Sequence, residues 1–543
     1  MNEPAVPADD VWARVEASLS RDPAAGLNTA TEVCGRYAAD RGRLALVVRH
    51  PDGSSQRWTY YELDKAAAKA ARMFARAGLR RGDRVAGLLS RQVESWIVAL
   101  AAWRSGLVYV PLFCGFGTDA LRYRLRSSHA RLVVVDHSWR DTLDGALSEL
   151  DAGDLTVVTV TGPGGTGLIA GDHSFWAEWE RSAPDGPEAY TSGSDAATLL
   201  FTSGTTGEPK SCVMPHSGLL SLIPFVEYSL AVTTADLLFN TADPGWAYGL
   251  YTTGAVPMAL GVPRVIYSGD FDTNAWWQVL DEEGVSCIAT APSAYRKLLA
   301  PLLRNGPPAE LRRVAAAGEP LDADTTSRWS EAGAPAIRDG YGLSEVGMVL
   351  ADPAVGAEPE PGSLAGPVPG FDVELVDREG NPVGAGESGL IAVHSPRYQL
   401  SNGYENRPAE WQARWRGDLF VTDDRARARP DGRWCFLGRE DDMIITSGYN
   451  VSPVEVERVL SEHPGVLEAA AVAGSGDRGG TVVRAVVVRG DGSGDVGELE
   501  RQLRAEVAHR VGKHASPRLF DYVDALPRNE VGKLQRVQLR SPS

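Results

Sequence analysis

The sequence contains little cysteine for its length and none in paired spacing. Five cysteines occur in 543 residues, and they are scattered along the chain: Cys34, Cys114, Cys212, Cys287 and Cys435. A disulfide framework or a cysteine-based zinc site needs closely spaced cysteines, so the pattern favours neither. We therefore expect a protein of a reducing compartment, and specifically a cytoplasmic one.

The sequence also lacks any apolar run long enough to span a bilayer, which takes about 20 residues. The first 19 residues, MNEPAVPADDVWARVEASL, contain neither the basic nor the apolar segment of a secretory leader. We expect a soluble protein that has no membrane partner.

Positive charge is scarce relative to negative charge. Lys and Arg total 54 against 71 Asp and Glu, so the formal net charge is -17. Proteins that bind nucleic acid need a basic surface to displace counterions, which argues against a nucleic-acid partner. A pocket for a single nucleotide needs positive charge only locally and remains compatible with this composition.

The length and composition that are present indicate a large globular protein. At 543 residues the chain exceeds one ordinary hydrophobic core, so we expect two or more domains. Hydrophobic residues make up 43% and charged residues 23%, which is typical of folded rather than disordered chains.

Segments typical of strands and helices alternate between residues 84 and 136. RVAGLL, LVYVPLF and RLVVVD predict buried strands, ESWIVALAAWRSG predicts a helix closed by Gly106, and TDALRYRLRSS predicts a helix capped by Thr118. This order predicts a parallel sheet covered by helices.

A second, smaller α+β unit is predicted after a turn-rich stretch, GREDDMIITSGYN. Its signals are LEAAAVAG, TVVRAVVVRG, the amphipathic segment ELERQLRAEVAHRVG and a last strand around FDYVDALPR. We place the boundary near 439–442, which divides the chain into domains of residues 1–439 and 440–543. A Pro- and Gly-rich stretch at 352–370 predicts a long connection within the first domain.

The stretch LLFTSGTTGEPK, which ends at Lys210, predicts an anion-binding loop. An apolar strand at 197–201 stops abruptly, and the loop combines hydroxyl donors, glycines that allow close backbone approach, and one lysine. This chemistry suits an oxyanion as highly charged as a triphosphate. The spacing is not that of the Walker loop, since Pro209 stands directly before the lysine. A solvated linker is the alternative, but the flanks ATLLF and VMPHSGLL are typical of ordered structure.

Four later stretches follow this loop in a recognisable order. They are AAAGEPL, DGYGLSE, VTDDRARARPDGRWCFLGRED and LPRNEVGKLQR. With the loop, they resemble the adenylate-forming superfamily of acyl-CoA synthetases, adenylation domains and luciferases. YVPLFCGFGTDALRYRLRSSHA and TADPGWAYGLY are most similar to the short- and medium-chain acyl-CoA synthetase branch. The resemblance implies a large N-terminal α/β domain with helix-covered, largely parallel sheets, and a small mobile α+β C-terminal domain.

The resemblance implies an ATP site. Tyr341 would stack on adenine, Asp424 would accept the ribose hydroxyls, Arg439 would reach ribose or phosphate, and Glu345 would hold Mg²⁺. A plain core tyrosine and a helix-end carboxylate are the alternatives for Tyr341 and Glu345. The implied cofactor-binding residues are Thr202, Ser203, Gly204, Thr205, Thr206, Gly207, Lys210, Gly318, Glu319, Pro320, Asp339, Gly340, Tyr341, Gly342, Ser344, Asp424 and Arg439.

The same resemblance implies three catalytic residues, Lys533, Glu345 and Thr202. Lys533 would contact the α-phosphate and the attacking carboxylate, because two anions must meet and gain from positive charge placed between them. A solvated terminal lysine is the alternative. After adenylation, rotation of the small domain at the hinge residue Asp441 would replace Lys533 with the segment ITSGYN.

The acyl pocket is implied in part. Acetyl-specific relatives carry a Trp where this chain has Gly342, so we expect an acid larger than acetate, of medium chain length or aromatic. Trp246, Tyr248, Tyr251 and Met348 would form the pocket wall with Gly342. Ordinary core packing is the alternative for these side chains.

Several positions depart from the family pattern and leave the acceptor open. Asn450 and Ala508 stand where relatives place CoA-binding arginines, although Arg510 or Lys513 could substitute. Asp423 and Ser211 replace glycines.

Three hypotheses follow. The first is an acid–CoA ligase that uses ATP, Mg²⁺ and CoA; the second is an adenylating ligase whose acceptor is a carrier-protein thiol, an amine, or an aryl amine reacting with activated nitrite; the third is a non-catalytic nucleotide binder.

Overall fold

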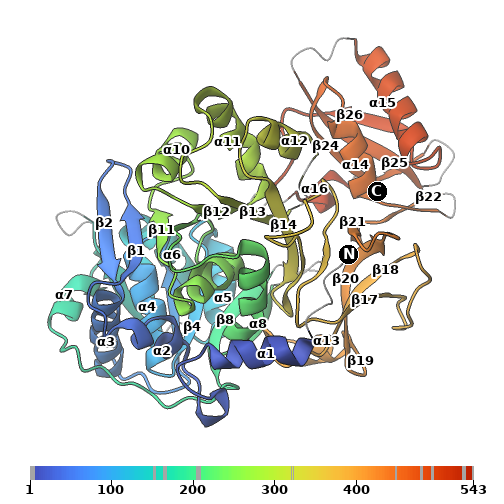
Figure 1. Cartoon of the computed structure of the whole chain (residues 1–543). Coiled ribbons are helices and arrows are strands. Elements are labelled where there is room, and N and C mark those ends of the chain that lie inside the picture. Colours follow the sequence, from blue (N-terminus) through green and yellow to red (C-terminus); the bar gives the residue numbers. More distant parts are fainter. Residues whose placement is uncertain are drawn as a thin grey trace.

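The computed structural model describes residues 7–150, 155–162, 168–202, 209–319, 321, 323–446, 449–476, 481–490, 495–528 and 534–540. These residues form two large sheets, which are enclosed by helices, and three smaller sheets (Figure 1). None of the helices in these ranges is long and apolar enough to cross a membrane.

The first large sheet has the strand order β7-β6-β5-β3-β4-β8-β9. All neighbours are parallel except the last pair, β8 and β9. This confirms the parallel sheet predicted from residues 84–136. The strands are β3 (Arg84–Leu88), β4 (Val108–Leu112), β5 (Leu132–Asp136), β6 (Thr156–Val160), β7 (His173–Ser174), β8 (Ala196–Thr202) and β9 (Lys210–Pro215).

The helices between these strands also match the prediction, with one correction at a helix start. α4 (Val93–Arg104) and α5 (Thr118–Ser128) occupy the expected segments, and Gly106 follows α4 with φ of +66°. Thr118 does not cap α5, because it is already helical and Gly117, with extended backbone, is the N-cap residue. The helices α3 (Tyr60–Arg76), α6 (Arg140–Leu147) and α7 (Phe175–Glu180) complete this half.

The second large sheet has the order β16-β15-β14-β13-β12-β10-β11-β1-β2. The central strands β14, β13, β12, β10, β11 and β1 are parallel, and β14 and β15 form an antiparallel hairpin. Its strands are β1 (Leu44–Arg49), β2 (Ser55–Thr59), β10 (Leu238–Asn240), β11 (Arg264–Tyr267), β12 (Cys287–Thr290), β13 (Arg313–Ala317), β14 (Ile337–Leu343), β15 (Gly347–Ala351) and β16 (Gly366–Pro367).

Helices lie between and outside the two sheets. One core joins the second sheet to α10 (Thr273–Glu282), α11 (Pro292–Asn305) and α12 (Ala323–Glu331), which cover its outer face (Figure 1). The largest core fills the space between the sheets around α3, α4 and α8 (Gly218–Phe225). The remaining helices of this region are α1 (Ala8–Ala17), α2 (Thr29–Val33) and α9 (Val256–Ala259).

A smaller antiparallel sheet follows the connection at 352–370. It contains β17 (Val373–Val376), β18 (Ser388–His394), β19 (Trp415–Arg416), β20 (Leu419–Ala428) and β21 (Trp434–Arg439), with α13 (Pro408–Gln412) before β19. The connection itself is mostly irregular, as predicted, and includes only the two-residue strand β16.

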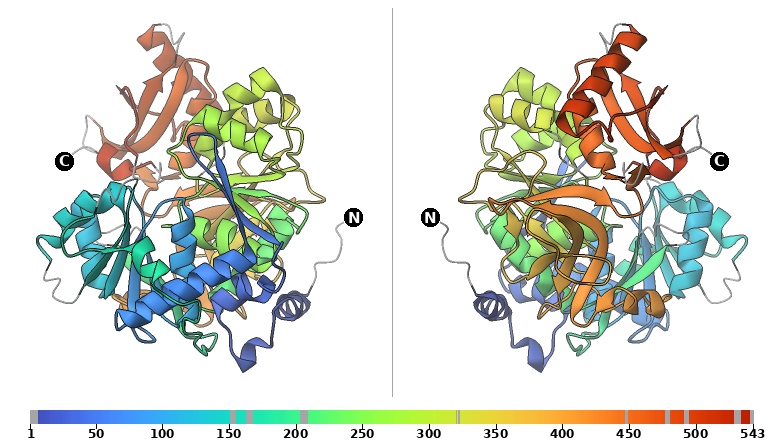
Figure 2. Two further views of the ribbon diagram at one scale, coloured as in Figure 1. Left: turned by 90° about the vertical axis from the view of Figure 1, so that its left-hand side faces the viewer. Right: turned by 90° about the vertical axis from the view of Figure 1, so that its right-hand side faces the viewer.

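The last hundred residues form an α+β unit with hydrophobic cores of its own. β24 (Val466–Ser475), β25 (Thr481–Arg489), β26 (Leu519–Tyr522) and α15 (Val496–Arg510) match the predicted elements. Part of the stretch expected to be turns instead forms the hairpin of β22 (Ile444–Thr446) and β23 (Tyr449–Val451), because Ile444 and Val451 are buried in this core. The unit, completed by α14 (Pro453–Ser461) and α16 (Arg536–Leu539), projects from one end of the molecule (Figure 2).

Candidate active site

The predicted anion-binding loop connects the antiparallel strands β8 and β9. Thr202 ends β8 and pairs in register with Lys210, which begins β9. The Lys210 side chain is mostly buried, its ammonium lies 3.2 Å from Glu410 Oε2, and it stands over the Tyr404 ring. The strand pairing therefore brings both ends of the loop together at one edge of the sheet.

Tyr341 and Asp424 meet across two sheets. The Tyr341 hydroxyl donates to Asp424 Oδ2 at 2.7 Å, which joins β14 to β20. The Asp424 backbone N–H donates to Thr422 Oγ1 at 3.1 Å, and the Thr422 hydroxyl donates to the Ile391 carbonyl. Asp424 is only 5% exposed, so these contacts orient a buried carboxylate.

Glu345 lies in the turn between β14 and β15, directly after Ser344. Its Oε1 accepts a 2.6 Å hydrogen bond from the Tyr404 hydroxyl. Burial, together with the nearby Glu345 charge, raises the pKa of Tyr404 far above its ordinary value, so the phenol stays a donor. The Tyr404 hydroxyl therefore orients this carboxylate.

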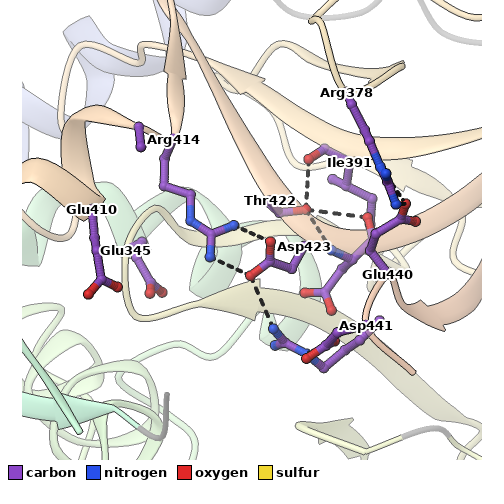
Figure 3. A network of polar contacts seen from close by, with 12 residues as sticks. Glu345, Arg378, Ile391, Glu410, Arg414, Thr422, Asp423, Glu440 and Asp441 are labelled. Carbon is purple, nitrogen blue, oxygen red and sulfur yellow. Dashed lines mark hydrogen bonds and ion pairs between the residues drawn. The ribbon is translucent and has the colours of Figure 1, made fainter. Parts of the chain in front are cut away.

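Two arginines converge on Asp423, the neighbour of Asp424 (Figure 3). Arg414 donates from both terminal nitrogens to the two oxygens of Asp423. Arg439 Nη2 donates to Asp423 Oδ2 at 3.1 Å, and Arg439 Nε donates to Asp441 Oδ1 at 3.0 Å. Burial raises the pKa of Asp423, but the bonds and charge of Arg414 outweigh it and hold the pKa below the ordinary value.

Most of these side chains line one pocket, whereas Tyr341, Glu410 and Asp441 are not among its lining residues. The pocket brings together five residues predicted from the sequence, Thr202, Lys210, Glu345, Asp424 and Arg439, which come from β8, β9, β20, β21 and the β14–β15 turn. Its lining residues are Thr202, Lys210, Leu343, Glu345, Tyr404, Arg414, Phe420, Thr422, Asp423, Asp424 and Arg439.

The sequence analysis assigned no site role to five of the lining residues, Leu343, Tyr404, Arg414, Phe420 and Thr422. Tyr404 and Arg414 are the two of these whose side chains bond to Glu345 and Asp423. Neither belongs to a local motif, and each reaches the pocket through folding of distant segments. The one available signal was Asp423, because an additional carboxylate beside a predicted phosphate site requires a nearby cation.

Other predicted nucleotide residues follow β13 or lie within β14. Gly318 follows β13 with φ of +93°, which favours glycine. Glu319 accepts a hydrogen bond from Ser293, and burial raises its pKa while the charges of Arg296 and Arg528 lower it. Asp339 and Gly340 lie at the base of the β14–β15 hairpin, where the Asp339 carboxylate accepts from the Gly340 N–H rather than lining the pocket.

The predicted acyl-pocket residues separate into two groups. Trp246 packs against Phe113 and Phe116 with ring centroids 5.5 and 5.8 Å away. Its indole N–H and the Tyr248 hydroxyl are buried and have no hydrogen-bond partner among the described residues. Because buried polar groups are ordinarily paired, both side chains are candidates to face a bound molecule.

Tyr251 and Gly342 differ from the prediction. Tyr251 is fully buried, and its hydroxyl donates to Thr198 Oγ1 at 2.8 Å, so it is a core residue rather than part of a pocket wall. The space beside Gly342 is filled: a Cβ there would lie 2.3 Å from the Gly347 carbonyl oxygen and 2.7 Å from Met348 Cα. The glycine is required by close packing within the β14–β15 hairpin, and the expectation of open space at this position is wrong.

The residues around the predicted hinge are held from both sides. Glu440 accepts from Arg378 and Arg425, which belong to the sheet of β17 to β21 (Figure 3). Asp442 accepts from Arg536 and Arg540 at the C-terminal end of the chain, at 3.5 and 2.6 Å. Asp441 lies between these two anchors.

Several predicted residues lie outside the described part of the chain. They are Ser203, Gly204, Thr205, Thr206, Gly207, Pro320 and Lys533. Their predicted roles rest on the sequence alone.

Comparison with known proteins places this geometry in context. The family model described as AMP-binding enzyme matches residues 35–405, and the model of the AMP-binding enzyme C-terminal domain matches residues 455–533. The human mitochondrial acyl-coenzyme A synthetase ACSM5 is 31% identical over 98% of this chain and 89% of its own length.

Solved structures show the same architecture over the whole chain. An acyl-CoA synthetase of Brucella canis is 33% identical, with a TM-score of 0.77 and coverage of 98% of both chains. A benzoate CoA ligase of Burkholderia xenovorans is 26% identical, with a TM-score of 0.82, and covers 95% of this chain and 100% of its own.

Proposed function

Because the chain belongs to the AMP-binding enzyme family, and within it to the AMP-forming acyl-CoA synthetases, we propose that it activates a carboxylic acid larger than acetate with ATP and transfers the acyl group to coenzyme A. The observation that carries this proposal is the shared pocket. It joins the residues proposed for the ribose, Asp424 and Arg439, to those proposed for the phosphates, Thr202, Lys210 and Glu345.

The first half-reaction is adenylation. A carboxylate oxygen of the acid attacks the α-phosphorus of ATP, a phosphorus–oxygen bond forms, and the bond to pyrophosphate breaks. Lys210 and Arg439 place positive charge along the pocket, where it offsets repulsion between the two anions. In the second half-reaction a thiol attacks the acyl carbonyl, and AMP leaves with the former carboxylate oxygen.

The pocket also fits a magnesium ion bound together with phosphate. Mg²⁺ prefers oxygen ligands and is commonly held by one or two carboxylates together with substrate phosphates. Glu345 supplies a carboxylate and Thr202 a hydroxyl on the same pocket lining. Bound there, the ion would neutralise charge on the phosphate oxygens. Among the described residues, no group of three or more acidic, His or Cys side chains could hold a metal without phosphate.

The position of the C-terminal segment supports the proposed role of Lys533. Arg528, five residues before Lys533 in the sequence, lies close enough to Glu319 for its charge to lower the pKa of that carboxyl. Arg528 therefore lies near Glu319, which follows β13 beside the proposed nucleotide site. We assign Lys533 to the adenylation step, and we place the boundary between fixed and rotating domains at Asp441.

The proposed acid is of medium chain length or aromatic. The unpaired indole and phenol donors of Trp246 and Tyr248 support a ligand that contacts an aromatic wall. The mitochondrial acyl-coenzyme A synthetase and the benzoate CoA ligase among the similar proteins are consistent with this size class.

Measuring ATP–pyrophosphate exchange with a panel of acids tests the proposal. We expect medium-chain or aromatic acids to stimulate the exchange more than acetate does. Product masses with and without CoA then identify the acceptor. A clear preference for acetate would exclude the proposed substrate class, and no exchange with any acid would exclude adenylation.

A ligase with a different acceptor is the second candidate. Ala508 lies on α15 where the family resemblance implies a CoA-binding arginine, and Arg510, the nearest substitute, is ion-paired with Glu462. A carrier-protein thiol or an amine, including an aryl amine with activated nitrite, would then receive the activated group. Formation of an amide or diazo product, with no acyl-CoA when CoA is present, would favour this candidate.

A further inference from the structure

The pocket contains one carboxylate more than the proposed nucleotide chemistry uses. Asp424 and Glu345 have proposed roles at the ribose and the metal, whereas Asp423 has none. Asp423 nevertheless lines the pocket, with its side chain 34% exposed, and lies within range of the Lys210 charge. An uncompensated carboxylate there would repel the phosphates of ATP.

Arg414 supplies the matching positive charge. The hairpin of β19 and β20 folds back so that the Arg414 carbonyl accepts from the Val421 N–H at 2.9 Å, which brings Arg414 beside Asp423, nine positions further along the chain. Arg414 then forms a two-pronged pair with Asp423 (Figure 3). The pocket thus has three cations, Lys210, Arg414 and Arg439, and three carboxylates, Glu345, Asp423 and Asp424.

The pair also holds a third residue. Asp423 Oδ2, which accepts from Arg414, accepts from Arg439 as well. Arg439 Nε also donates to Asp441, the residue proposed to rotate as the hinge. Asp423 lies on β20, so its hold on Arg439 does not depend on the conformation of residue 441.

We propose that Arg414 and Asp423 form a positioning pair that keeps Arg439 directed into the nucleotide site while cancelling the charge of the additional carboxylate. This inference rests on the proposed ATP-dependent function. Arg414 acts through Asp423, and Asp423 acts through Arg439, so neither is assigned a catalytic role.

A purely structural ion pair is the competing explanation. It predicts that loss of either partner lowers stability without a selective effect on ATP. The lining position of both residues and the shared oxygen at Arg439 favour the positioning role, because breaking the pair changes both the net charge of the pocket and the anchoring of Arg439.

The test is a double-mutant cycle on the full chain. The variants are Arg414→Gln, Asp423→Asn and the combination of both, with Arg414→Lys as the conservative change. Arg429→Gln is the matched control, because Arg429 pairs with Glu360 and Asp431 on the same β20–β21 hairpin outside the pocket. For each variant we would measure the Kd of ATP by calorimetry, KM for ATP and for the acid in pyrophosphate exchange, and Tm.

Arg414→Gln should weaken ATP binding about 10-fold or more, because it leaves the Asp423 carboxylate facing the phosphates without its paired cation. Arg414→Lys should weaken it less, because the charge remains while the two-pronged geometry is lost. The double variant should recover a Kd within about threefold of wild type, since no uncompensated charge is left and the amide oxygen introduced at position 423 can still accept from Arg439. Asp423→Asn should lower kcat more than it raises KM for ATP. KM for the acid should change little in all these variants. The Arg429→Gln control should keep the wild-type Kd and KM for ATP.

Three outcomes would overturn the inference. The first is an ATP Kd for Arg414→Gln equal to that of wild type. The second is a double variant whose Kd for ATP is no lower than that of Arg414→Gln. The third is a set of variants in which KM for ATP and KM for the acid change equally and in proportion to the loss of Tm. If wild-type protein binds no ATP, the proposed function itself fails and the inference fails with it. If wild type binds ATP and exchanges pyrophosphate, only the variant results decide the positioning role.

Discussion

At the scale of single residues, the Tyr341 hydroxyl links two parts of the proposed nucleotide site. Stacking on adenine requires only the ring, yet the hydroxyl donates to Asp424 at 2.7 Å and the ring lies near Phe436. Burial raises the pKa of Tyr341, as does the Asp424 charge, so the hydroxyl remains protonated and keeps donating. The residue therefore orients the carboxylate proposed for the ribose in addition to offering a ring.

Replacing Tyr341 with Phe tests this second role. A hydrogen bond to a charged group contributes about 1.5–3 kcal/mol, so Tyr341→Phe should raise KM for ATP by about 10-fold or more. The effect should shrink with 2′-deoxy-ATP or 3′-deoxy-ATP, because less of the ribose contact remains to be lost. Pyrophosphate exchange at varied nucleotide concentration measures both effects.

Tyr398→Phe is the matched control for this change. Its hydroxyl donates to Glu16 Oε1 at 2.6 Å, a tyrosine–carboxylate bond of the same kind that lies outside the pocket. We expect its KM for ATP to stay at the wild-type value. Equal effects of the two substitutions would show that Tyr341 acts through general stability.

At the scale of elements, the connection after β21 passes through Asp441 between two anchors, and the Asp441 carbonyl accepts from Arg540 at 2.8 Å. Arg378 and Arg425 hold Glu440 to the antiparallel sheet, while Arg536 and Arg540 hold Asp442 to the end of the chain. A rotation of the C-terminal unit that keeps both anchors must change the backbone at Asp441. The anchors therefore support the hinge position predicted from the sequence.

Fixing the backbone at this position should separate the two half-reactions. In Asp441→Pro, the ring holds φ near -65°, which should slow thioester formation while adenylation proceeds at a rate near that of wild type. Asp441→Ala is the control, because it removes the contact with Arg439 and leaves the backbone free.

Lys533→Ala should show the opposite pattern, with adenylation slowed about 10²–10³-fold and thioester formation from a supplied acyl-adenylate preserved.

Single-turnover assays of each half-reaction measure these rates. If Asp441→Pro and Asp441→Ala slow thioester formation equally, the carboxylate rather than rotation is responsible. If Lys533→Ala slows both steps equally, one conformation serves both reactions.

At the scale of the whole molecule, a hydrogen bond to His216 connects the N-terminal segment to the core. It is fully buried after β9, and its Nδ1 accepts from the Thr29 N–H at 3.1 Å. That bond requires a neutral ring. Burial lowers the pKa of His216 to about 4 from an ordinary value of 6.5. The neutral ring therefore contributes stability above pH 6.5, and this contribution is lost as the pH falls toward 4.

Replacing His216 with Asn should reduce the acid sensitivity of folding. The Asn oxygen can still accept from Thr29, but it does not titrate. Between pH 7 and 4.5 the wild type should lose about 2–3 kcal/mol more unfolding free energy than His216→Asn does. Urea unfolding midpoints at the two pH values measure the difference. His463→Asn is the control, because its Nδ1 accepts from the Gly465 N–H in a partly exposed site. An identical pH dependence of stability in His216→Asn and wild type would show that protonation of His216 is not the cause of the acid sensitivity.

Local patterns were enough to predict the strands and helices of residues 84–136 and several elements of the C-terminal α+β unit. The alternation in 84–136 and the apolar strands near the C-terminus depend on neighbouring residues, so burial and periodicity could be read directly. Thr118 and the β22–β23 hairpin were misjudged, because a helix start and a hairpin depend on backbone angles and on a distant core. The motifs also contained the five predicted residues that line one pocket, although other predicted residues of the same motifs, such as Tyr341 and Asp339, do not line it.

By itself, the sequence determined the fold class, the family and the candidate residues Lys210, Glu345, Asp424 and Arg439, because these depend on local pattern and on motifs within short segments. Only the tertiary structure decided which charges meet. Tyr404 reaches Glu345 across 59 positions, and Arg414 reaches Asp423 through a hairpin. It also decided that Gly342 faces the main chain of Gly347 and that Tyr251 belongs to the core. Such contacts form when separate elements pack together, and the spacing of residues along the chain does not encode them one by one.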